Sequence, residues 1–270
     1  MPMAVVTGAG SGLGRAIAID LANRGYLVHA TDLDADAAAA TATTIGAGAT
    51  AADLDVTDAD ACRAAAERLA SLDVWVNNAG VLATGLSWEQ DEETRRTMLE
   101  VNALGTMNGT VAALARMVPA GQGHVVNIVS LAGLVAAPGE VSYAASKHAA
   151  LAFTLGTLFD LRRSGIRGVQ LSAVCPDGVW TPMIEDRLAV PDAASSFSGR
   201  LLTAEQVATA VGRLTEHPRP LLVMPRWRGP AVRFFDLFPR LALRLLPLVM
   251  RDARRRQKRY KKLIESGRWP

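Results

Sequence analysis

Short apolar runs alternate along this chain with longer segments whose apolar residues recur at helical spacing. The run at residues 123–130 carries β-branched residues at neighbouring positions, which is typical of a strand buried on both faces. The pattern predicts strands over residues 3–6, 27–31, 50–54, 73–76, 123–130, 168–174 and 220–224.

Helical periodicity fills the intervals between these strands. It predicts helices over residues 15–22, 35–44, 58–70, 92–118, 142–164 and 203–215. Thr57 is placed to be the N-cap of the third helix. Strands that alternate with helices imply crossover connections and a parallel sheet, with helices on both faces. We therefore expect one α/β domain over residues 1–224.

The composition fits one domain in a reducing compartment. The chain has 270 residues, of which 50% are hydrophobic and 20% charged, enough for a sizeable core. Its only cysteines, Cys62 and Cys175, lie far apart, which argues against a disulfide scaffold. The four histidines are scattered, so we expect no metal site. No basic segment precedes the first strand, which predicts a cytoplasmic protein without a signal peptide.

The net charge of +3 conceals two parts of opposite sign. Residues 1–218 contain 14 lysines and arginines against 23 acidic residues, a net charge of −9. Residues 219–270 contain 15 against 3, a net charge of +12. An acidic domain thus precedes a basic C-terminal segment, and each part needs its own explanation.

A glycine-rich turn at residues 7–14, Thr-Gly-Ala-Gly-Ser-Gly-Leu-Gly, joins the first strand to the first helix. Its glycines allow close approach of a ligand, and the helix N-terminus suits a phosphate. Asp32 ends the second strand, where a carboxylate binds ribose hydroxyls and repels a 2′-phosphate. Strand, turn, helix and acid together predict NAD rather than NADP, because Arg15 alone does not build a phosphate site.

Polar or glycine-rich residues follow six successive predicted strands. After the turn and Asp32 come Asp55-Val56, then Asn77-Asn78-Ala79-Gly80, then Ser130, then residues 176–181. Ligands of parallel sheets bind beyond the carboxyl ends of the strands. We therefore expect these residues to share one site.

Tyr143 and Lys147 are spaced i and i+4 in a predicted helix, so they share one face. The unperturbed pKa of a tyrosine is about 10. A nearby ammonium group and the helix N-terminus favour the phenolate and lower that pKa, which suits proton transfer. Taken alone, such a pair more commonly reflects an exposed tyrosine and lysine on an amphipathic helix.

In combination these motifs resemble the short-chain dehydrogenase/reductase family. The resemblance rests on Thr-Gly-x3-Gly-x-Gly at 7–14, Asn-Asn-Ala-Gly at 77–80, Ser130 and Tyr-x3-Lys at 143–147, in order over residues 3–224. It implies a Rossmann-type doubly wound parallel sheet of about seven strands. It also implies NAD(P)-linked interconversion of alcohols and ketones, and assembly into homodimers or homotetramers.

The resemblance implies roles for individual residues. Tyr143 is expected to act as the general acid/base and Ser130 to polarise the substrate oxygen. Lys147 is expected to lower the pKa of Tyr143 and hold the nicotinamide ribose, while Asn102 breaks a helix and holds a water in the proton relay. Asn77 is expected to support its strand. The implied cofactor contacts are Gly8, Ser11, Gly12, Leu13, Gly14, Asp32, Leu33, Asp55, Val56, Asn78, Ala79, Gly80, Tyr143, Lys147, Val179 and Thr181.

One position departs from the family pattern. Members usually have Pro-Gly after the sixth strand, whereas here Asp177 follows Pro176. Either this position tolerates a side chain because it needs no positive φ, or a carboxylate near the nicotinamide changes cofactor orientation or substrate preference. The spacing to Thr181 is unchanged, so the expected reaction class stays the same under both interpretations.

Substrate specificity is expected in residues 131–141 and 183–201. Only Arg187 and Arg200 there are placed for an acidic substrate, so we predict an NAD-dependent oxidoreductase for a lipophilic secondary alcohol or ketone. A rival from another class is a catalytically idle NAD-binding sensor or scaffold, which would not need the four intact catalytic positions. The predicted apolar wall comprises Leu131, Leu134, Val135, Met183, Leu188, Val190 and Phe197.

The segment 225–270 exceeds what the sheet needs. Its apolar residues recur at helical spacing opposite arginines, which predicts an amphipathic helix broken at Pro239 or Pro247. It contains no run of about 18 apolar residues and is not a membrane span. Residues 230–262 fit an anionic membrane surface, peripheral to the inner membrane, and equally fit packing on the domain or a second subunit. No nucleic acid is expected, because aromatic interleaving and a recognition motif are missing.

Overall fold

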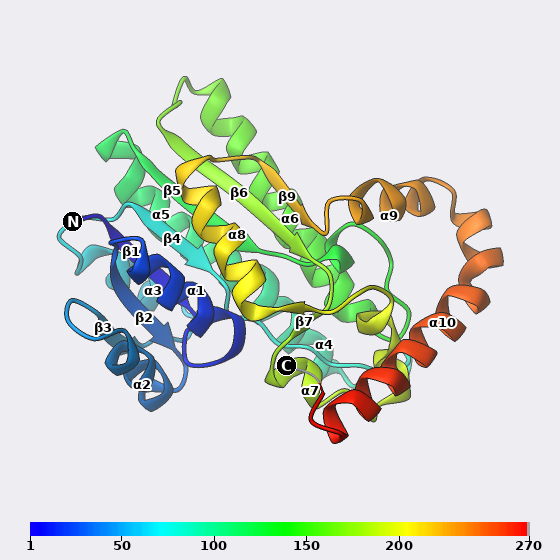
Figure 1. The fold of residues 1–270 in the computed structure, drawn as a ribbon. Helices are drawn as coiled ribbons and strands as arrows, with labels where there is room; N and C mark the ends of the chain where they lie inside the picture. Colours follow the sequence, from blue (N-terminus) through cyan, green and yellow to red (C-terminus); the bar gives the residue numbers. More distant parts are fainter. Residues whose placement is uncertain (269–270) are drawn as a thin grey trace.

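The computed structural model describes residues 1–268 and has a parallel seven-stranded sheet at its centre (Figure 1). The strand order is β3-β2-β1-β4-β5-β6-β9, and every neighbouring pair is parallel. The predicted Rossmann-type doubly wound α/β fold is confirmed. The strands are β1 Met3–Thr7, β2 Leu27–Asp32, β3 Thr50–Asp53, β4 Val74–Asn77, β5 Gly123–Ile128, β6 Val169–Pro176 and β9 Leu221–Met224.

Helices cover both faces of this sheet, and a small second sheet pairs β7 Val179–Trp180 with β8 Leu202–Thr203. The helices of the domain are α1 Gly12–Asn23, α2 Ala35–Ile45, α3 Ala59–Glu67, α4 Glu92–Leu99, α5 Gly105–Ala120, α6 Val141–Arg163, α7 Pro182–Glu185 and α8 Ala204–Glu216. Two more, α9 Arg228–Leu237 and α10 Pro239–Glu265, follow β9.

Two apolar layers hold the helices to the sheet. On one face, Ile17 of α1 and Val211 of α8 pack in the same cluster as the residues of β1 and β2. On the other face, Met117 of α5 and Leu158 of α6 pack with residues of α3 and β4. All four side chains are buried, and Val126 and Val125 of β5 pack in the first and the second layer, so this strand is buried on both faces, as its sequence predicted.

The direction of winding reverses at β1. This strand pairs with β2 on one side and with β4 on the other, so Val6 lies opposite both Ala30 and Val76. The two halves of the sheet therefore wind outward in opposite directions and leave a crevice at the carboxyl ends of β1 and β4. Every predicted motif that follows a strand is thereby brought to this edge.

The N-cap of α3 differs from the predicted one. Asp58, not Thr57, is the N-cap of α3, since its carboxylate accepts hydrogen bonds from the N–H groups of Asp60 and Ala61. The Thr57 hydroxyl instead donates to Asp55 Oδ1 at 2.7 Å. A carboxylate on the next residue simply outcompeted the hydroxyl for the free N–H groups at the helix start.

The predicted helix over residues 92–118 is divided by a π-helical segment, Glu100–Leu104, between α4 and α5. Asn102 lies in this segment and is fully buried. π-helical turns inside helices are frequent at functional sites. The interruption agrees with the helix-breaking position that the family resemblance implied for Asn102.

Residues 228–265, comprising α9 and α10, form what we call the C-terminal arm. Figure 1 shows the arm leaving the end of β9 and returning along α10 toward the underside of the domain. The break between its helices falls at Pro239, whereas Pro247 lies inside α10. Within residues 1–268, no helix combines the length and the apolar character needed to cross a membrane.

The far end of the arm is fastened to the domain by buried polar contacts. Gln257 Nε2 donates to the carbonyl oxygens of Arg187 and Val190, at 3.0 and 2.8 Å. The Leu201 N–H donates to the Tyr260 hydroxyl at 3.1 Å. The arm is thus anchored at both ends and passes over the segment that carries the expected substrate-binding residues.

Candidate active site

A cavity of about 640 Å³ lies at the carboxyl ends of the strands and extends from the glycine-rich turn to the inner side of the C-terminal arm. Ser130 lines it, whereas Asn102 does not. Every residue expected to contact the cofactor also lines it: Gly8, Ser11, Gly12, Leu13, Gly14, Asp32, Leu33, Asp55, Val56, Asn78, Ala79, Gly80, Tyr143, Lys147, Val179 and Thr181.

The turn between β1 and α1 has a backbone that favours glycine. Gly8 and Gly12 have φ angles of 63° and 50°, in the left-handed region. A Cβ atom at Gly14 would collide with the carbonyl oxygen of Gly8. The N-cap of α1, Ser11, makes no side-chain cap hydrogen bond. The first N–H groups of α1 are therefore available to a phosphate at the edge of the cavity.

Asp32 ends β2 beside this turn. One carboxylate oxygen accepts a hydrogen bond from the Gly10 N–H at 2.8 Å, and the other accepts one from the Asp34 N–H at 3.1 Å. The guanidinium group of Arg15 donates to the Thr44 hydroxyl at 3.1 Å. This end of the cavity fits a dinucleotide, since it combines a glycine cradle, a helix N-terminus and a fixed carboxylate.

The two asparagines after β4 have different neighbours. Asn78 Nδ2 donates to the carbonyl oxygens of Thr7 and Gly8, at 3.1 and 3.0 Å, and so ties the end of β4 to the glycine-rich turn. Asn77 is buried, and its Nδ2 donates to Asn127 Oδ1 at 2.8 Å. Asn78 thus shapes the cavity, while Asn77 joins β4 to β5, the supporting place expected of it.

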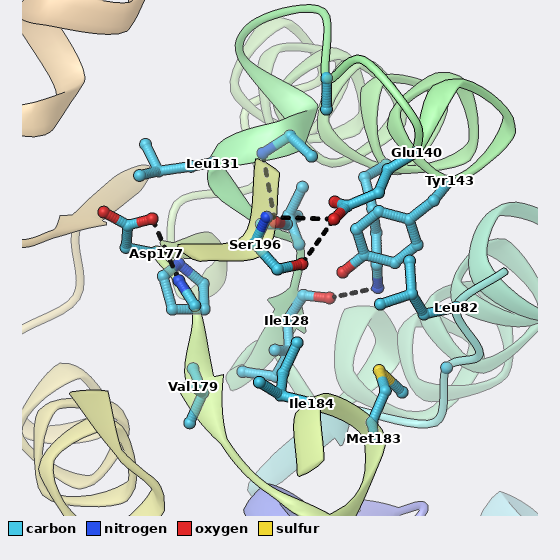
Figure 2. Close-up of a pocket in the computed structure, with 18 of the residues that line it drawn as sticks. Leu82, Ile128, Leu131, Glu140, Tyr143, Asp177, Val179, Met183, Ile184 and Ser196 are labelled. Atoms are coloured by element: carbon cyan, nitrogen blue, oxygen red, sulfur yellow. Dashed lines mark hydrogen bonds between the residues drawn. The ribbon is translucent and has the colours of Figure 1, made fainter. Parts of the chain in front are cut away.

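Tyr143 points into the cavity from the first turn of α6 (Figure 2). Ser130, just beyond β5, lies close enough for its side chain to favour the ionised form of the Tyr143 hydroxyl. One helical turn later, Lys147 places its Nζ 5.8 Å from the centre of the Tyr143 ring and donates to the carbonyl oxygen of Ile128 at 3.0 Å. Three of the four predicted catalytic side chains therefore meet at one point of the cavity wall.

Burial dominates the pKa of both members of the Tyr143–Lys147 pair. It raises the pKa of Tyr143, and the nearby side chain of Ser130 opposes this rise only in part. Burial also lowers the pKa of Lys147 to about 8. The expected lowering of the Tyr143 pKa is therefore wrong for this chain by itself, because the lysine is desolvated beside the tyrosine and directs its ammonium group at Ile128.

Asn102 lies behind the cavity wall. Its Oδ1 accepts from the Val81 N–H at 2.9 Å, and its Nδ2 donates to the Val81 carbonyl at 2.9 Å and to Ser146 Oγ at 3.1 Å. A Cβ atom at Gly80 would lie 3.0 Å from Asn102 Oδ1 and 3.5 Å from Lys147 Nζ. Asn102 thus holds the segment after β4 in place, and Gly80 of this segment lies between Asn102 and Lys147.

Asp177 has a partner that neither interpretation of the sequence foresaw. Its backbone has no positive φ, as the first interpretation required. Its Oδ2 lies 2.9 Å from Arg228 Nε as an ion pair, off the line of a hydrogen bond, and its Oδ1 accepts from the Gly178 N–H at 3.1 Å. Burial raises the pKa of Asp177, and Arg228 opposes the rise. The carboxylate therefore connects the end of β6 to the C-terminal arm.

Glu140 is a buried residue of the site that no sequence motif predicted. It precedes α6 directly, and its Oε1 accepts hydrogen bonds from the N–H and hydroxyl of Ser196 at 3.0 and 2.7 Å (Figure 2). Burial raises its pKa to about 7. The only sequence signal was its position as the sole charged residue in the apolar stretch 131–141.

The apolar wall differs from the predicted one. Leu131, Val135 and Met183 line the cavity. The other four residues do not, because they pack into hydrophobic clusters beneath it: Leu134, Leu188, Val190 and Phe197. Neither predicted arginine lines it, and Arg187 instead donates to the Leu82 carbonyl at 2.6 Å. Apolar residues of the C-terminal arm complete the wall: Val232, Phe235, Ala242, Leu245, Leu246, Val249 and Met250.

The profile of the short chain dehydrogenase family matches residues 2–190, well over half of the chain. The chain belongs to the short-chain dehydrogenase/reductase family. This dehydrogenase is 38% identical over 225 residues to 2-(R)-hydroxypropyl-CoM dehydrogenase from Xanthobacter autotrophicus, a match that covers 77% of its own chain and 89% of that protein.

Other relatives share the same region. The dehydrogenase is 37% identical to 1-deoxy-11-beta-hydroxypentalenate dehydrogenase from Streptomyces exfoliatus, with 77% of each chain covered. It superposes with a TM-score of 0.79 and 29% identity on the crystal structure of a short-chain dehydrogenase/reductase from Burkholderia phymatum in complex with NAD, covering 89% of its own chain and 95% of the other. The dehydrogenase is therefore an oxidoreductase that acts on CH–OH groups.

Proposed function

We propose that this dehydrogenase uses NAD to interconvert a neutral, lipophilic secondary alcohol and the corresponding ketone. The observation that carries the proposal is the meeting of Ser130, Tyr143 and Lys147 between two different ends of one cavity. One end has the glycine cradle and Asp32, and the other is walled by apolar side chains of the C-terminal arm.

Ser130 and Tyr143 hold the substrate oxygen between their hydroxyl groups in this mechanism. During ketone reduction, Tyr143 Oη gives its proton to the carbonyl oxygen while Ser130 donates a hydrogen bond to that oxygen as negative charge develops. During alcohol oxidation, the proton returns from the substrate hydroxyl to Tyr143. NAD supplies the hydride acceptor or donor when it is bound. The raised pKa of Tyr143 keeps its proton available as an acid at neutral pH.

Asp32 supports NAD over NADP. Its carboxylate is fixed at the end of β2 by two backbone N–H groups, at the place where an adenosine ribose needs a hydrogen-bond acceptor. A 2′-phosphate at the same place would meet a like charge. Arg15, the basic residue nearest in sequence to the turn, is already bonded to Thr44. The NAD in the related crystal structure is consistent with this assignment.

The charges of the substrate end support a neutral substrate. Asp177 and Arg228 both line the cavity but offset one another as an ion pair. Burial raises the pKa of Glu140 to about 7, so its carboxyl is neutral over a wider pH range than that of an exposed glutamate. Lys147 is directed at the carbonyl of Ile128. Apart from Lys147, whose ammonium group donates to that carbonyl, no cation without a paired carboxylate is found among the residues that line this end.

Replacement of Tyr143 by Phe tests the proposal. We expect the rate of NADH formation with a panel of hydrophobic secondary alcohols to fall by about 10²- to 10⁴-fold, while NAD binding measured by calorimetry stays unchanged. A Phe variant with normal rates would sink the assignment. If the wild type binds NAD but turns over no alcohol or ketone in the panel, the idle NAD-binding protein considered above becomes the better account.

Assembly is a separate part of the proposal. Large apolar side chains are exposed on two neighbouring helices, Val111 on α5 and Phe159 on α6, where a second copy could cover them. We propose a cytoplasmic homo-oligomer that uses this face. Sedimentation equilibrium of the wild type and a Val111→Gln/Phe159→Gln variant measures it, and a wild type that is monomeric at all concentrations contradicts it.

A further inference from the structure

The C-terminal arm presents an outer surface that the reaction does not use. Six large apolar side chains on α9 and the first half of α10 face solvent, and Leu237 and Leu243 are 74% and 69% exposed. None of the six lines the cavity. We call this set the apolar tip: Phe234, Leu237, Phe238, Leu241, Leu243 and Leu248.

Exposed arginines are interleaved with the apolar tip. Arg240, Arg244 and Arg251 are spaced i, i+4 and i+11, so they share one side of α10. The side chains of Leu243 and Leu248 flank that side. Arginines with long apolar stems can place their charge at lipid headgroups while neighbouring leucines go deeper.

The second half of α10 continues as a basic band. Eight exposed lysines and arginines occupy residues 251–262: Arg251, Arg254, Arg255, Arg256, Lys258, Arg259, Lys261 and Lys262. Asp252 is the one acid within this stretch, and it pairs with Arg256 at 2.8 Å. Three of these arginines, Arg255, Arg256 and Arg259, also line a second cavity together with Arg200.

We propose that the C-terminal arm docks on an anionic membrane surface, with the apolar tip in the acyl boundary and the basic band on lipid headgroups. Charge complementarity selects this partner. Residues 219–270 carry a net charge of +12, and basic residues next to a lipid surface attract anionic headgroups. An apolar partner surface without negative charge would leave the interleaved arginines unsatisfied, and no helix of residues 1–268 is suited to cross the bilayer.

The first half of α10 is apolar on both its outer and inner sides. Leu245, Leu246 and Val249 line the cavity, while Leu243 and Leu248 of the apolar tip face outward. Docking therefore places the apolar end of the cavity beside the bilayer. This consequence rests on the proposed function, because it gives a lipophilic substrate a route from the membrane to Tyr143; the docking itself does not depend on that reaction.

Vesicle co-sedimentation of the full chain tests the proposal. The vesicles are pure phosphatidylcholine, or equal parts of phosphatidylcholine and phosphatidylglycerol. The tip variant is Leu237→Gln/Leu243→Gln/Leu248→Gln, which keeps good helix formers in the arm. The band variant is Arg254→Glu/Lys258→Glu/Lys261→Glu. The matched control replaces exposed apolar residues outside both the arm and the proposed oligomer face, Leu86→Gln/Trp88→Gln.

We expect the wild type and the control to sediment with the anionic vesicles and not with the neutral ones. The tip variant should partition at least about tenfold more weakly, since three leucines no longer enter the acyl boundary. The band variant should lose binding, and salt should weaken that of the wild type. Circular dichroism and light scattering report whether each variant keeps its fold and its oligomeric state.

Three results would overturn the docking proposal. They are equal binding of the wild type to neutral and anionic vesicles, undiminished binding of the tip variant, and a tip variant that changes from oligomer to monomer, which would make a second copy the occupant. The Tyr143→Phe variant should bind vesicles like the wild type. A wild type that binds the vesicles but turns over no alcohol or ketone in the panel would therefore count against the proposed function and not against the docking.

Discussion

Asp177 Oδ2 lies 2.9 Å from Arg228 Nε, so a buried ion pair joins the end of β6 to the first residue of α9. Arg228 Nη2 also donates to Ser198 Oγ at 2.9 Å, and a Cβ atom at Gly199 would collide with the Asp177 carboxylate. This one ion pair thus connects three parts of the chain: the end of β6, the segment before β8 that contains Ser198, and the C-terminal arm.

Removal of Asp177 and removal of Arg228 are expected to lower the stability of the fold by different amounts. Arg228→Ala should destabilise the fold by about 3–5 kcal/mol, because the carboxylate of Asp177, with only 5% of its side chain exposed, is left without its partner. Asp177→Gly should cost less, because the Arg228 side chain is 17% exposed and keeps its bond to Ser198. Denaturant unfolding of both single variants and the double variant measures these costs and their coupling.

The exposed pair of Arg96 and Glu92 provides the comparison for this experiment. Its side chains are 62% and 76% exposed, so Arg96→Ala should change stability by less than about 1 kcal/mol. The proposed asymmetry is wrong if Asp177→Gly costs as much as Arg228→Ala. Strictly additive costs in the double variant would show that the two side chains do not act as a pair.

Glu140 should make stability depend on pH. Its pKa rises from an ordinary value of 4.5 to about 7 in the folded chain. Between pH 4.5 and about 7, the folded state therefore keeps a proton that the unfolded state has already released. The contribution of the protonated Glu140 to the free energy of unfolding is fully present below pH 4.5 and is lost as the pH rises through about 7. Over this window the loss is on the order of 3 kcal/mol, at about 1.4 kcal/mol per pH unit.

Glu140→Gln removes this titration while an amide oxygen can still accept from the Ser196 N–H and hydroxyl. The stability of the variant should therefore fall less than that of the wild type between pH 4.5 and 7 in thermal unfolding. The charge of Arg187 favours the ionised carboxylate and limits the effect. Glu185→Gln, at an exposed position, serves as the control. Parallel pH profiles for the wild type and Glu140→Gln would exclude Glu140 as the source.

The sequence was sufficient for features that depend on local patterns. Alternating runs defined the seven strands, and the glycines at 8, 12 and 14 marked a turn whose backbone and packing exclude larger residues. The sequence did not predict the contacts of Asp177 with Arg228 and of Glu140 with Ser196, because these contacts join elements that lie far apart in the chain. The direction of the Tyr143 pKa was missed for a related reason, since desolvation is set by everything packed around the ring.

Asp32→Ala should change cofactor preference. The variant loses the carboxylate expected to accept hydrogen bonds from the ribose, so NAD affinity should fall about tenfold or more. Affinity for NADP should rise relative to that for NAD, because the like charge is gone. Calorimetric titration with both cofactors measures this. The control is Asp36→Ala, which changes an exposed neighbouring residue and keeps the carboxylate of Asp32. An unchanged ratio of the two affinities would refute the role of Asp32.

Gly14→Ala and Gly156→Ala should have opposite effects. At Gly14, the new methyl group meets the Gly8 carbonyl and Asn78 Nδ2, so the turn must open and its tie to β4 must break. At Gly156, in the interior of α6, nothing lies within 4 Å of the new atom, and replacing a helical glycine by alanine stabilises by roughly 0.5–1 kcal/mol. We expect Gly14→Ala to lose both stability and NAD binding, and Gly156→Ala to unfold at higher denaturant concentration with unchanged NAD affinity. Normal NAD affinity in Gly14→Ala would mean that the close packing of this turn is not what forms the dinucleotide site.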